Sequence, residues 1–466
     1  MNSAERVHLW DCMASSGAVA AGQLRGRRAT VALAELQDRS FLGPHLETLR
    51  DRAVLIATRD QLPTATTLIE LDGVARRMVL CTPDLGVDQL AAVARTAAAG
   101  AVVLEPHSDD LKLPPAIKRI VLAAHPMAVG PRRAGCRTEW ILLTSGTTGT
   151  PKLVVHTLQS LCGALPGPHG LGARSTWSTF YDIRRYGGLQ IYLRAMLAGA
   201  PLVLSSAGEP PADFLARAAA AGVTHISGTP SHWRGALMSG RAGALNPQYV
   251  RLSGEVADQS ILDNLRAAYP RARIAHAFAS TEAGVAFDVN DGIAGFPMEF
   301  LEGSRDGIEM KVVGGTLRIR SGRTAAGYLG DVPPINADAD GYLDTGDMVE
   351  LVGERYYFRG RVGGVINVGG LKVYPEEVES VLNADPRVRM SLVRPKRSPI
   401  TGAIVVADVV LADPASPAGD ECSERLKADL LDACRRSLAA HKVPAMLRFV
   451  PALEFTAAGK LVRPHA

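Results

Sequence analysis

The stretch that decides the fold class is LLTSGTTGTPKLVVH, residues 142–156. The apolar run WILLT at residues 140–144 has the length of a buried strand, and it leads into a loop rich in glycine and threonine. Glycines let backbone amides turn toward an anion, and neighbouring hydroxyls add donors, so this loop is suited to phosphate. The candidate phosphate loop comprises Thr144, Ser145, Gly146, Thr147, Thr148 and Gly149, with Lys152 at its rim.

The loop does not match the Walker A pattern, which places glycine directly before the lysine and serine or threonine directly after it. Here Lys152 lies between Pro151 and Leu153, so NTPases of the kinase and motor types are disfavoured. A plain turn is the alternative interpretation, because loops of glycine and threonine also follow strands that bind nothing.

On both sides of the loop, apolar runs of strand length alternate with alanine- and leucine-rich helical stretches. AVLIA at 53–57 and AVVLEP at 101–106 are separated by such a stretch, and PADFLARAAAAG at 211–222 precedes VTHIS at 223–227. This alternation predicts α/β layers with largely parallel sheets. From residue 309 onward the segments look like β-hairpins, with GGTL and GERYYF as turns, which predicts a β-rich layer.

A glycine cluster at residues 360–370 marks a domain boundary. It precedes YPEEVESVL, in which Pro375 suits a first helical turn and the two glutamates after it suit a helix N-terminus. We expect a large α/β domain over residues 1–361, containing the β-rich layer. A small α+β domain over 362–466 follows, with a strand in AIVVADVVL and a long amphipathic helix after it.

Composition indicates a globular protein that acts on small molecules. Of 466 residues, 47% are hydrophobic and 21% are charged, and the net charge of +4 is not concentrated in a basic block. No apolar run reaches membrane-spanning length, and the six cysteines form no C-x-x-C pair. We therefore expect a cytoplasmic protein with reduced thiols and with neither a nucleic-acid partner nor a membrane partner.

Further motifs follow the phosphate loop in a fixed order: FASTEAG at 278–284, GYLDTGDMV at 341–349, FRGRVGGVINVGGLKVYPEEVE at 358–379 and TAAGK at 456–460. Together they resemble the adenylate-forming superfamily of acyl- and aryl-CoA ligases, amino-acid adenylation domains and luciferases. The resemblance runs from about residue 139 to the end of the chain. The first 135 or so residues match only in α/β character.

The resemblance implies a two-step reaction. A carboxylic acid, aryl or short acyl, reacts with ATP and Mg²⁺ to give an acyl-adenylate and pyrophosphate, and the thiol of coenzyme A then takes the acyl group. Three alternatives remain: loading of a carrier-protein phosphopantetheine, a luciferase-like oxidoreductase, and a non-catalytic nucleotide-binding relative. The motif residues together argue against the last. The implied partners are the acid and possibly an acyl carrier protein, in a monomer or homodimer.

Three residues are implied to be catalytic. Lys460 occupies the place of the lysine that bridges the carboxylate and α-phosphate oxygens, where a point charge stabilises the transition state. Glu282 matches the magnesium-binding glutamate, and Thr281 would reach the α-phosphate. In isolation, a lysine near a chain end or a lone glutamate is more often a solvated surface charge.

The resemblance also implies a nucleotide site. The candidate phosphate loop would hold the β- and γ-phosphates, and the ionised carboxylate of Asp347 would accept hydrogen bonds from both ribose hydroxyls. Phe278, where the family usually has tyrosine, can stack on adenine. The remaining implied nucleotide-binding residues are Lys152, Gly254, Glu255, Ala279, Ser280 and Arg361. A turn-stabilising role for Asp347 and a structural salt bridge for Arg361 are the alternatives.

Substrate choice is implied to depend on TFYDIRRYGGLQIYLRAMLAGA, residues 179–200, and on GTPSHWRGAL. Counting back from its glycine pair places Arg185 or Tyr186 in the acyl pocket. Gly188, His232 and Trp233 are further candidates. An arginine could bind a second polar group on the acid, or it could be a surface charge.

The boundary region carries two further implied roles. Gly369, Gly370, Leu371 and Lys372 match the segment that enters the site for the thiol step, where bare glycines let a pantetheine arm pass close to the backbone. Gly363 and Gly364 replace the acidic or lysine pivot that often follows the GR dipeptide in the family. Glycine absorbs large φ/ψ changes at least steric cost, so we expect a hinge there and a mobile small domain.

Overall fold

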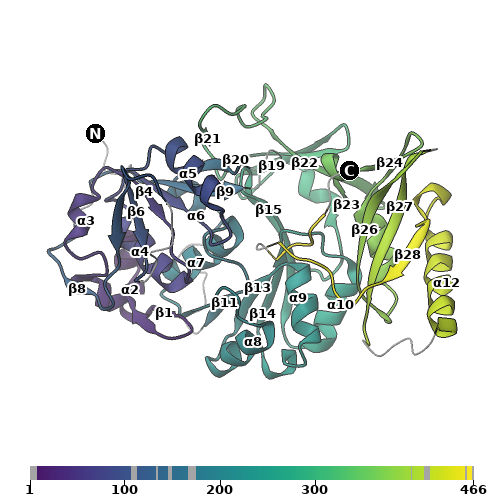
Figure 1. Cartoon of the computed structure of the whole chain (residues 1–466), viewed down its shortest axis with the longest axis horizontal. Helices are drawn as coiled ribbons and strands as arrows, with labels where there is room; N and C mark the ends of the chain where they lie inside the picture. Colours follow the sequence, from purple (N-terminus) through teal and green to yellow (C-terminus); the bar gives the residue numbers. More distant parts are fainter. Residues whose placement is uncertain are drawn as a thin grey trace.

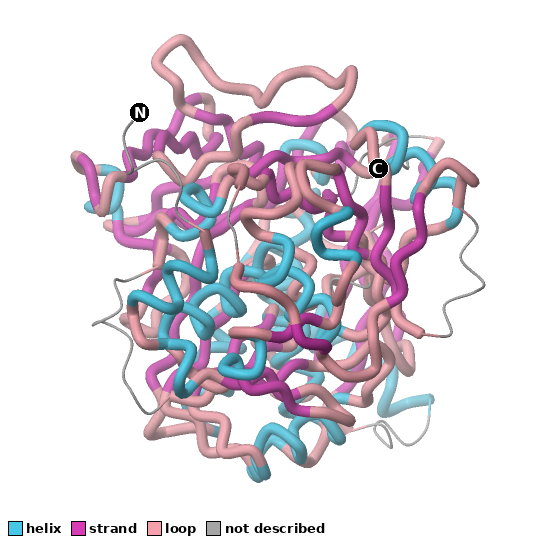
Figure 2. The backbone as a smooth tube through the Cα atoms, turned by 90° about the vertical axis from the view of Figure 1, so that its left-hand side faces the viewer, coloured by secondary structure: helices cyan, strands magenta, loops and turns pink. Residues whose placement is uncertain are grey.

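The computed structural model describes residues 8–106, 113–132, 135–144, 150–165, 175–399, 401–413, 420–456 and 459–463. A large body built on three sheets is followed by a smaller C-terminal part, at the right of Figure 1. Helices and strands are intermixed throughout in the end-on view of Figure 2. The predicted α/β organisation is confirmed.

The first sheet has seven strands and includes the strand that leads into the candidate phosphate loop. Its central pairings are parallel, whereas the two pairings made by β10 are antiparallel. In spatial order the strands are β21 (Gly327–Leu329), β10 (Lys152–His156), β9 (Glu139–Thr144), β5 (Arg77–Leu80), β4 (Ala53–Ile56), β6 (Ala101–Leu104) and β7 (Lys118–Val121). The helices of this half are α1 (Leu9–Ser15), α2 (Ala18–Ala21), α3 (His45–Thr48), α4 (Gln61–Leu71), α5 (Val87–Thr96) and α6 (Leu158–Cys162).

The second sheet has eight strands, of which the six from β15 to β1 pair in parallel. In spatial order they are β16 (Gly284–Val289), β15 (Arg273–Ser280), β14 (Tyr249–Ser253), β13 (His225–Gly228), β11 (Trp177–Thr179), β12 (Leu202–Leu204), β1 (Gln23–Arg25) and β2 (Thr30–Ala32). Its helices are α7 (Tyr186–Ala198), α8 (Pro211–Ala220), α9 (Pro230–Met238) and α10 (Gln259–Ala268). A separate two-stranded sheet joins β3 (Arg39–Ser40) to β8 (Met127–Ala128).

The largest hydrophobic core contains residues from both large sheets and from the helices α4 and α7. It includes Ile56 and Leu202 from strands of the two sheets, together with Leu68 and Leu189 from those helices. Separate cores form with α5 on the first sheet and with α8, α9 and α10 on the second. Each sheet is therefore covered by apolar helix faces, as parallel strands require.

The third sheet is antiparallel throughout and confirms the predicted β-rich layer. In spatial order its strands are β17 (Phe296–Pro297), β23 (Arg355–Arg361), β22 (Leu343–Val352), β20 (Thr316–Ser321), β19 (Ile308–Val313) and β18 (Ser304–Arg305). Both predicted turns lie between paired strands. The first turn contains Gly314 and Gly315, with φ angles of +60° and +83°.

The C-terminal part has a hydrophobic core of its own, drawn from residues between Ile366 and Leu447. Its elements are β24 (Ile366–Val368), β25 (Leu371–Val373), α11 (Pro375–Asn383), β26 (Val388–Ser398), β27 (Gly402–Leu411), α12 (Asp420–Ser437) and β28 (Met446–Phe449). The strand and the long helix expected there are present. The boundary at residue 361 stays a prediction.

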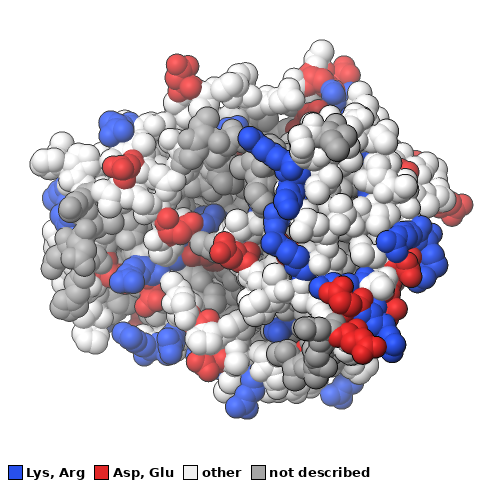
Figure 3. Space-filling view, turned by 45° about the vertical axis from the view of Figure 1, so that its right-hand side comes forward, with Lys and Arg blue, Asp and Glu red and all other residues white. Residues whose placement is uncertain are grey.

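Several expectations from composition can be compared with the structure. None of the described helices combines the length and the apolar character needed to cross a membrane. All six cysteines are free thiols. In Figure 3, Lys and Arg side chains form one row down the middle of the face shown and smaller groups elsewhere, so that face has no broad basic surface.

Candidate active site

Sequence-predicted site residues lie at the carboxyl ends of two neighbouring parallel strands, β14 and β15. Because β11, β13, β14 and β15 are neighbours in parallel, the residues that follow them lie along one edge of the sheet. Gly254 and Glu255 follow β14, and Thr281 and Glu282 follow β15. Thr229, which was not singled out from the sequence, follows β13 at the same edge. Ligands of α/β sheets bind outside this edge, so the position suits a binding site.

The C-terminal segment that carries Lys460 docks on this edge. The hydroxyl of Thr229 donates to the carbonyl of Gly459 at 2.8 Å, and the amide of Leu461 donates to Glu255 Oε1 at 3.2 Å. The other oxygen of Glu255 accepts from the amide of Ser231, in the first turn of α9, at 3.0 Å. Glu255 thus ties the segment to the large body.

The ammonium of Lys460 lies over the turn that follows β14. A Cβ placed on Gly254 would be 3.4 Å from Lys460 Cε and 3.8 Å from Nζ, which is ordinary van der Waals contact. Glycine is favoured here by its φ of +88° instead. The residue keeps exposed surface, but protein surrounds the ammonium, and this burial lowers its pKa below the usual lysine value. Glu255 and Asp347 oppose that shift, and Arg361 and Arg185 add to it.

Asp347 and Arg361 are partners across β22 and β23, and their side chains form an ion pair at 3.3 Å. Arg361 also donates to the carbonyl of Thr345 at 2.9 Å, and the Thr345 hydroxyl accepts from the amide of Asp347 at 3.1 Å. Burial raises the pKa of the Asp347 carboxyl, and Arg361 partly offsets this. The salt bridge considered for Arg361 exists, and its side chain is 67% exposed.

Thr281 and Glu282 form the turn between β15 and β16. His156, at the end of β10, contacts the carbonyl of Thr281 through Nε2 at 2.7 Å, and burial lowers the pKa of its imidazole to about 4. Ser280 accepts from the amide of Ala283 at 2.9 Å, which closes the turn. The role of His156 was missed, although it ends the stretch that decided the fold, because no local pattern shows a contact 125 residues away.

Glu282, the glutamate predicted to bind magnesium, is among the described residues. Among the described residues no group of three or more histidine, cysteine, aspartate or glutamate side chains could hold a metal. Magnesium is usually bound by one or two carboxylates together with substrate phosphates and waters. Glu282 contacts the same tyrosine, Tyr328, as Lys152 at the rim of the candidate phosphate loop, so a single glutamate here would fit a nucleotide-bound magnesium ion.

The candidate phosphate loop is flanked by two antiparallel strands. Thr144 ends β9, Lys152 begins β10, and the two residues are partners in the sheet. The loop is thus a connection between paired strands, unlike the strand-to-helix loop of the Walker A type. Ser145, Gly146, Thr147, Thr148 and Gly149 lie outside the described residues.

Phe278 belongs to an aromatic cluster under the third sheet. Its ring stacks on Phe358 with centroids 5.0 Å apart and on Phe287 at 5.9 Å. The side chain is half-buried, and Ala279 beside it is half-buried as well. Stacking of adenine on Phe278 stays a prediction.

Three residues expected in the acyl pocket have other surroundings. Tyr186 is buried in the largest core, with its ring 5.6 Å from that of His156. A Cβ on Gly188 would come within 2.2 Å of the carbonyl oxygen of Asp182, so this glycine permits close packing of α7. Trp233 is completely buried and contacts Tyr269. Tyr186 and Trp233 are thus core residues in this structure, and their assignment to the acyl pocket stays a prediction.

Arg185 and His232 remain candidates for the acyl pocket. Arg185 precedes α7 and pairs with Asp84 at 2.9 Å, with part of its side chain exposed. His232 stacks on Phe180 at 5.5 Å, and its Nδ1 accepts from the amide of Thr229 at 3.1 Å. Burial lowers the pKa of His232 to about 4, so the imidazole is neutral.

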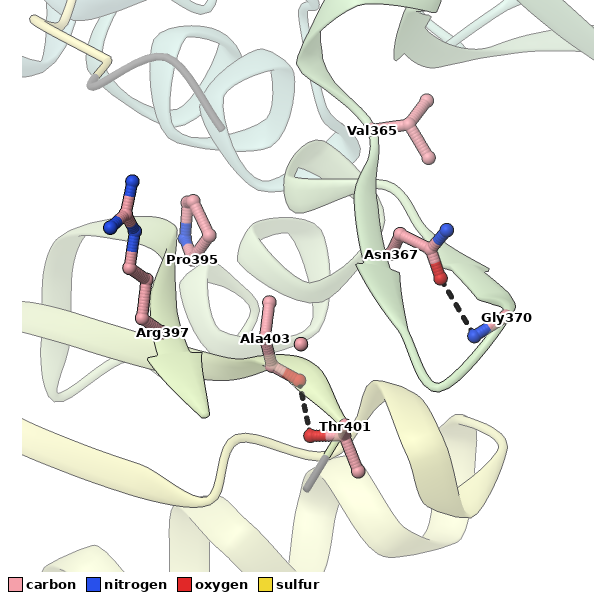
Figure 4. A pocket seen from close by; sticks show the side chains of 8 residues that line it. Val365, Asn367, Gly370, Pro395, Arg397, Thr401 and Ala403 are labelled. Carbon is pink, nitrogen blue, oxygen red and sulfur yellow. Dashed lines mark hydrogen bonds between the residues drawn. The ribbon is translucent and has the colours of Figure 1, made fainter. Parts of the chain in front are cut away.

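The glycine pair of the predicted thiol segment forms the turn between β24 and β25. Gly369 and Gly370 have φ angles of +59° and +92°, and Leu371 and Lys372 are exposed. A cavity of about 650 Å³ lies beside this hairpin, and Figure 4 shows Arg397 and Thr401 among its lining residues. Figure 1 places β24 at the top of the small part, apart from α9.

Gly363 and Gly364 lie in a single 3₁₀ turn, Val362–Gly364. Neither has a positive φ, and a Cβ on either would meet no atom within 4 Å. The arrangement seen here therefore does not itself require glycine at these positions. The hinge stays a prediction.

Comparison with known proteins agrees with this geometry. Residues 77–328 match the family model described as AMP-binding enzyme, and residues 377–460 match the model of the AMP-binding enzyme C-terminal domain. The first match covers more than half of the chain. The chain belongs to the AMP-binding enzyme family. The resemblance drawn from the motifs is confirmed.

Two relatives of this AMP-binding enzyme carry related names. A 2-succinylbenzoate–CoA ligase of Salmonella typhimurium is 32% identical over 308 residues, which cover 64% of this chain and 62% of the relative. A probable 2-succinylbenzoate–CoA ligase of Mycobacterium tuberculosis is 27% identical over 324 residues, which cover 66% of this chain and 80% of the relative. The chain thus spans less than two thirds of the first relative.

Solved structures show the same fold over nearly the whole chain. An anthranilate–CoA ligase in complex with anthranoyl-AMP has a TM-score of 0.81 at 18% identity and covers 99% of this chain and 97% of its own. Escherichia coli MenE with bound OSB-AMS has a TM-score of 0.72 at 21% identity, with 92% of each chain covered. The predicted fold is therefore confirmed.

Proposed function

We propose that this enzyme is an AMP-forming acid–thiol ligase. It activates a small carboxylic acid with ATP and then passes the acyl group to the thiol of coenzyme A. The observation that carries the proposal is the docking of the Lys460 segment on Thr229 and Glu255. This docking brings the lysine of the small domain to the sheet edge where Glu282 lies, near Asp347.

In the first step a carboxylate oxygen of the acid bonds to the α-phosphorus of ATP. The bond from that phosphorus to the bridging oxygen breaks, and pyrophosphate leaves with the electron pair. Lys460 stabilises the charge on the carboxylate and α-phosphate oxygens, and Asp347 orients the ribose by accepting from its hydroxyls. Catalysis of this kind needs positioning and charge neutralisation rather than a covalent enzyme intermediate.

A magnesium ion bound with ATP would neutralise part of the phosphate charge. Glu282 would hold it, with Thr281 placed toward the α-phosphate. Lys152 would contribute a second positive charge at the rim of the phosphate loop. These residues bind and orient the nucleotide and take no part in bond making.

In the second step the thiol sulfur bonds to the acyl carbon, the thiol proton is lost, and AMP leaves. Strand β24 of the glycine hairpin lies apart from α9 in Figure 1, and the N-cap residue of α9, Thr229, is the one that binds Gly459. A rotation of the small domain about the Gly363–Gly364 turn would exchange Lys460 for this hairpin. Bare backbone at the two glycines would then let a pantetheine arm approach closely.

For the acid we propose an aromatic carboxylate that carries a second polar group. The names of the relatives support this class, because 2-succinylbenzoate is an aromatic acid with a second carboxylate. Arg185 is the side chain we assign to that group. Its guanidinium pairs with Asp84 here, so the substrate would compete with or join this ion pair.

The test is pyrophosphate exchange with a panel of acids, including 2-succinylbenzoate, anthranilate, benzoate and short aliphatic acids. Coenzyme A or a phosphopantetheinylated carrier protein is then added, and thioester formation is measured. We expect exchange with aromatic acids and thioester only with coenzyme A. If thioester formed only on the carrier protein, the acceptor would be a phosphopantetheine thiol instead of coenzyme A. If no acid supported pyrophosphate exchange, the proposed function would be wrong.

A further inference from the structure

Tyr328 lies where the two large sheets meet at the phosphate site. It is the central residue of β21 and is the partner of Val154 in β10. Just before it, the amide of Ala325 donates to the carbonyl of Glu282 at 2.8 Å, and the amide of Ala326 donates to that of Val155 at 2.8 Å. The segment Ala325–Leu329 therefore holds a strand of the first sheet against a turn of the second.

The side chain of Tyr328 contacts two charges of opposite sign. Its hydroxyl donates to Glu282 Oε1 at 3.1 Å, and the Lys152 ammonium lies over its ring, 5.2 Å from the centroid. Among the described residues, Glu282 and Lys152 both contact Tyr328 and form no ion pair with each other. The hydrogen bond from Tyr328 occupies Glu282 Oε1 and leaves Oε2 outside this contact.

We propose that Tyr328 is a positioning residue that orients Glu282 and keeps it apart from Lys152. The proposal rests on the proposed function, in which both charges act on ATP and its metal ion. If Glu282 and Lys152 paired directly, each would neutralise a charge that the nucleotide and the metal need. An aromatic ring with a hydroxyl at its edge separates them, because the ring face attracts the ammonium while the hydroxyl binds the carboxylate.

Two substitutions separate these roles. Tyr328→Phe keeps the ring under Lys152 and removes only the hydrogen bond to Glu282. Tyr328→Leu removes both contacts. The readout is equilibrium binding of ATP by calorimetry, with and without magnesium, alongside a thermal melt that reports folding.

For Tyr328→Phe we expect the magnesium concentration needed for half-maximal ATP binding to rise about tenfold, as is typical when a partner of a metal ligand is lost. Binding of ATP without magnesium should be unchanged. For Tyr328→Leu, binding without magnesium should weaken as well, because Lys152 is then free to pair with Glu282.

The chain offers a matched control in Tyr342, which repeats this arrangement in the β-rich layer. Its hydroxyl donates to Glu309 at 3.0 Å, and the Lys311 ammonium lies 4.0 Å from its ring centroid. Tyr342→Phe should leave both binding constants at the wild-type values. If Tyr328→Phe shifts the magnesium dependence no more than Tyr342→Phe does, the positioning role is wrong. If the wild-type enzyme binds no ATP with or without magnesium, the proposed function itself fails.

Discussion

Gly459 lies against the imidazole of His232 so closely that a Cβ on the glycine would come within 1.9 Å of His232 Nε2. The glycine also has a φ of +68°, a conformation that residues with a side chain rarely adopt. His232 in turn stacks on Phe180 and contacts Thr229. The residue before Lys460 is therefore suited to its docking site as glycine.

Gly459→Ala should obstruct docking of the lysine segment. We expect pyrophosphate exchange to fall by roughly ten- to a hundredfold, the range that follows from about 1–3 kcal/mol of backbone strain. Thioester formation from supplied acyl-adenylate should survive. Gly243→Ala is the control, because Gly243 lacks a positive φ and has open space around it. Unchanged exchange in Gly459→Ala would show that this docked arrangement is not used.

Lys460→Ala should remove most adenylation, by about 10²–10³-fold, the loss typical of one charge-stabilising group. Thioester formation from supplied acyl-adenylate should continue, because only the first step develops the charge that this ammonium neutralises. Lys396→Ala, at an exposed position of the small domain, is the control. Wild-type rates of exchange in Lys460→Ala would contradict the assignment.

The adenylation rate should fall at alkaline pH. Burial lowers the pKa of Lys460 below its usual 10.5, so the ammonium is present at lower pH and is lost as pH rises through the lowered value. The Glu255 carboxylate opposes this shift, so Glu255→Gln should move the alkaline limb to lower pH. Pyrophosphate exchange across neutral and alkaline pH measures both effects. If the pH at which exchange falls were the same in Glu255→Gln as in the wild type, the alkaline fall would not result from loss of the Lys460 proton.

Glu282→Gln should raise the magnesium concentration for half-maximal pyrophosphate exchange by about tenfold or more, because an amide lacks the charge that a hard cation favours. Glu309→Gln, which alters a surface glutamate bonded to Tyr342, is the control. If the purified enzyme adenylates acids equally well in excess chelator, Glu282 loses its role.

Gly363→Pro should trap one orientation of the small domain, because proline fixes φ near −65° and removes the amide donor. We expect one half-reaction to be spared and the other suppressed. Rotation must also break contacts such as the 3.4 Å bond from Asn383 to Asp258. Gly363→Ala should behave like the wild type, since a Cβ there meets no neighbour. If Gly363→Pro changed both half-reactions equally, the hinge prediction for Gly363 would be wrong.

The α/β fold and the family were predictable from the sequence because both depend on short contiguous patterns. Alternation of apolar runs with helical stretches set the layers, and the motifs around Glu282, Asp347 and Lys460 identified the superfamily. Each of these signals lies within a few residues of chain. Such local patterns can be recognised in a sequence without knowing which segments contact each other in the fold.

Burial on a helix was less predictable. The sequence did not show that Tyr186 and Trp233, two candidates for the acyl pocket, are core residues. Each lies at the start of a helix beside a residue with more exposed surface, Arg185 and His232 respectively. Which neighbour faces the core depends on the rotation of the helix against its sheet, and tertiary packing sets that rotation.

The sequence by itself determined the class of fold, the family and most of the charged residues of the site. Only the tertiary structure decided how they are held: Glu255 binds Leu461 across 206 residues, Thr229 binds Gly459 across 230, and Tyr328 bonds to Glu282 while its ring contacts Lys152. Such contacts leave no local pattern, because they depend on the relative placement of whole sheets. A motif specifies which groups are available, and packing fixes their distance and charge state.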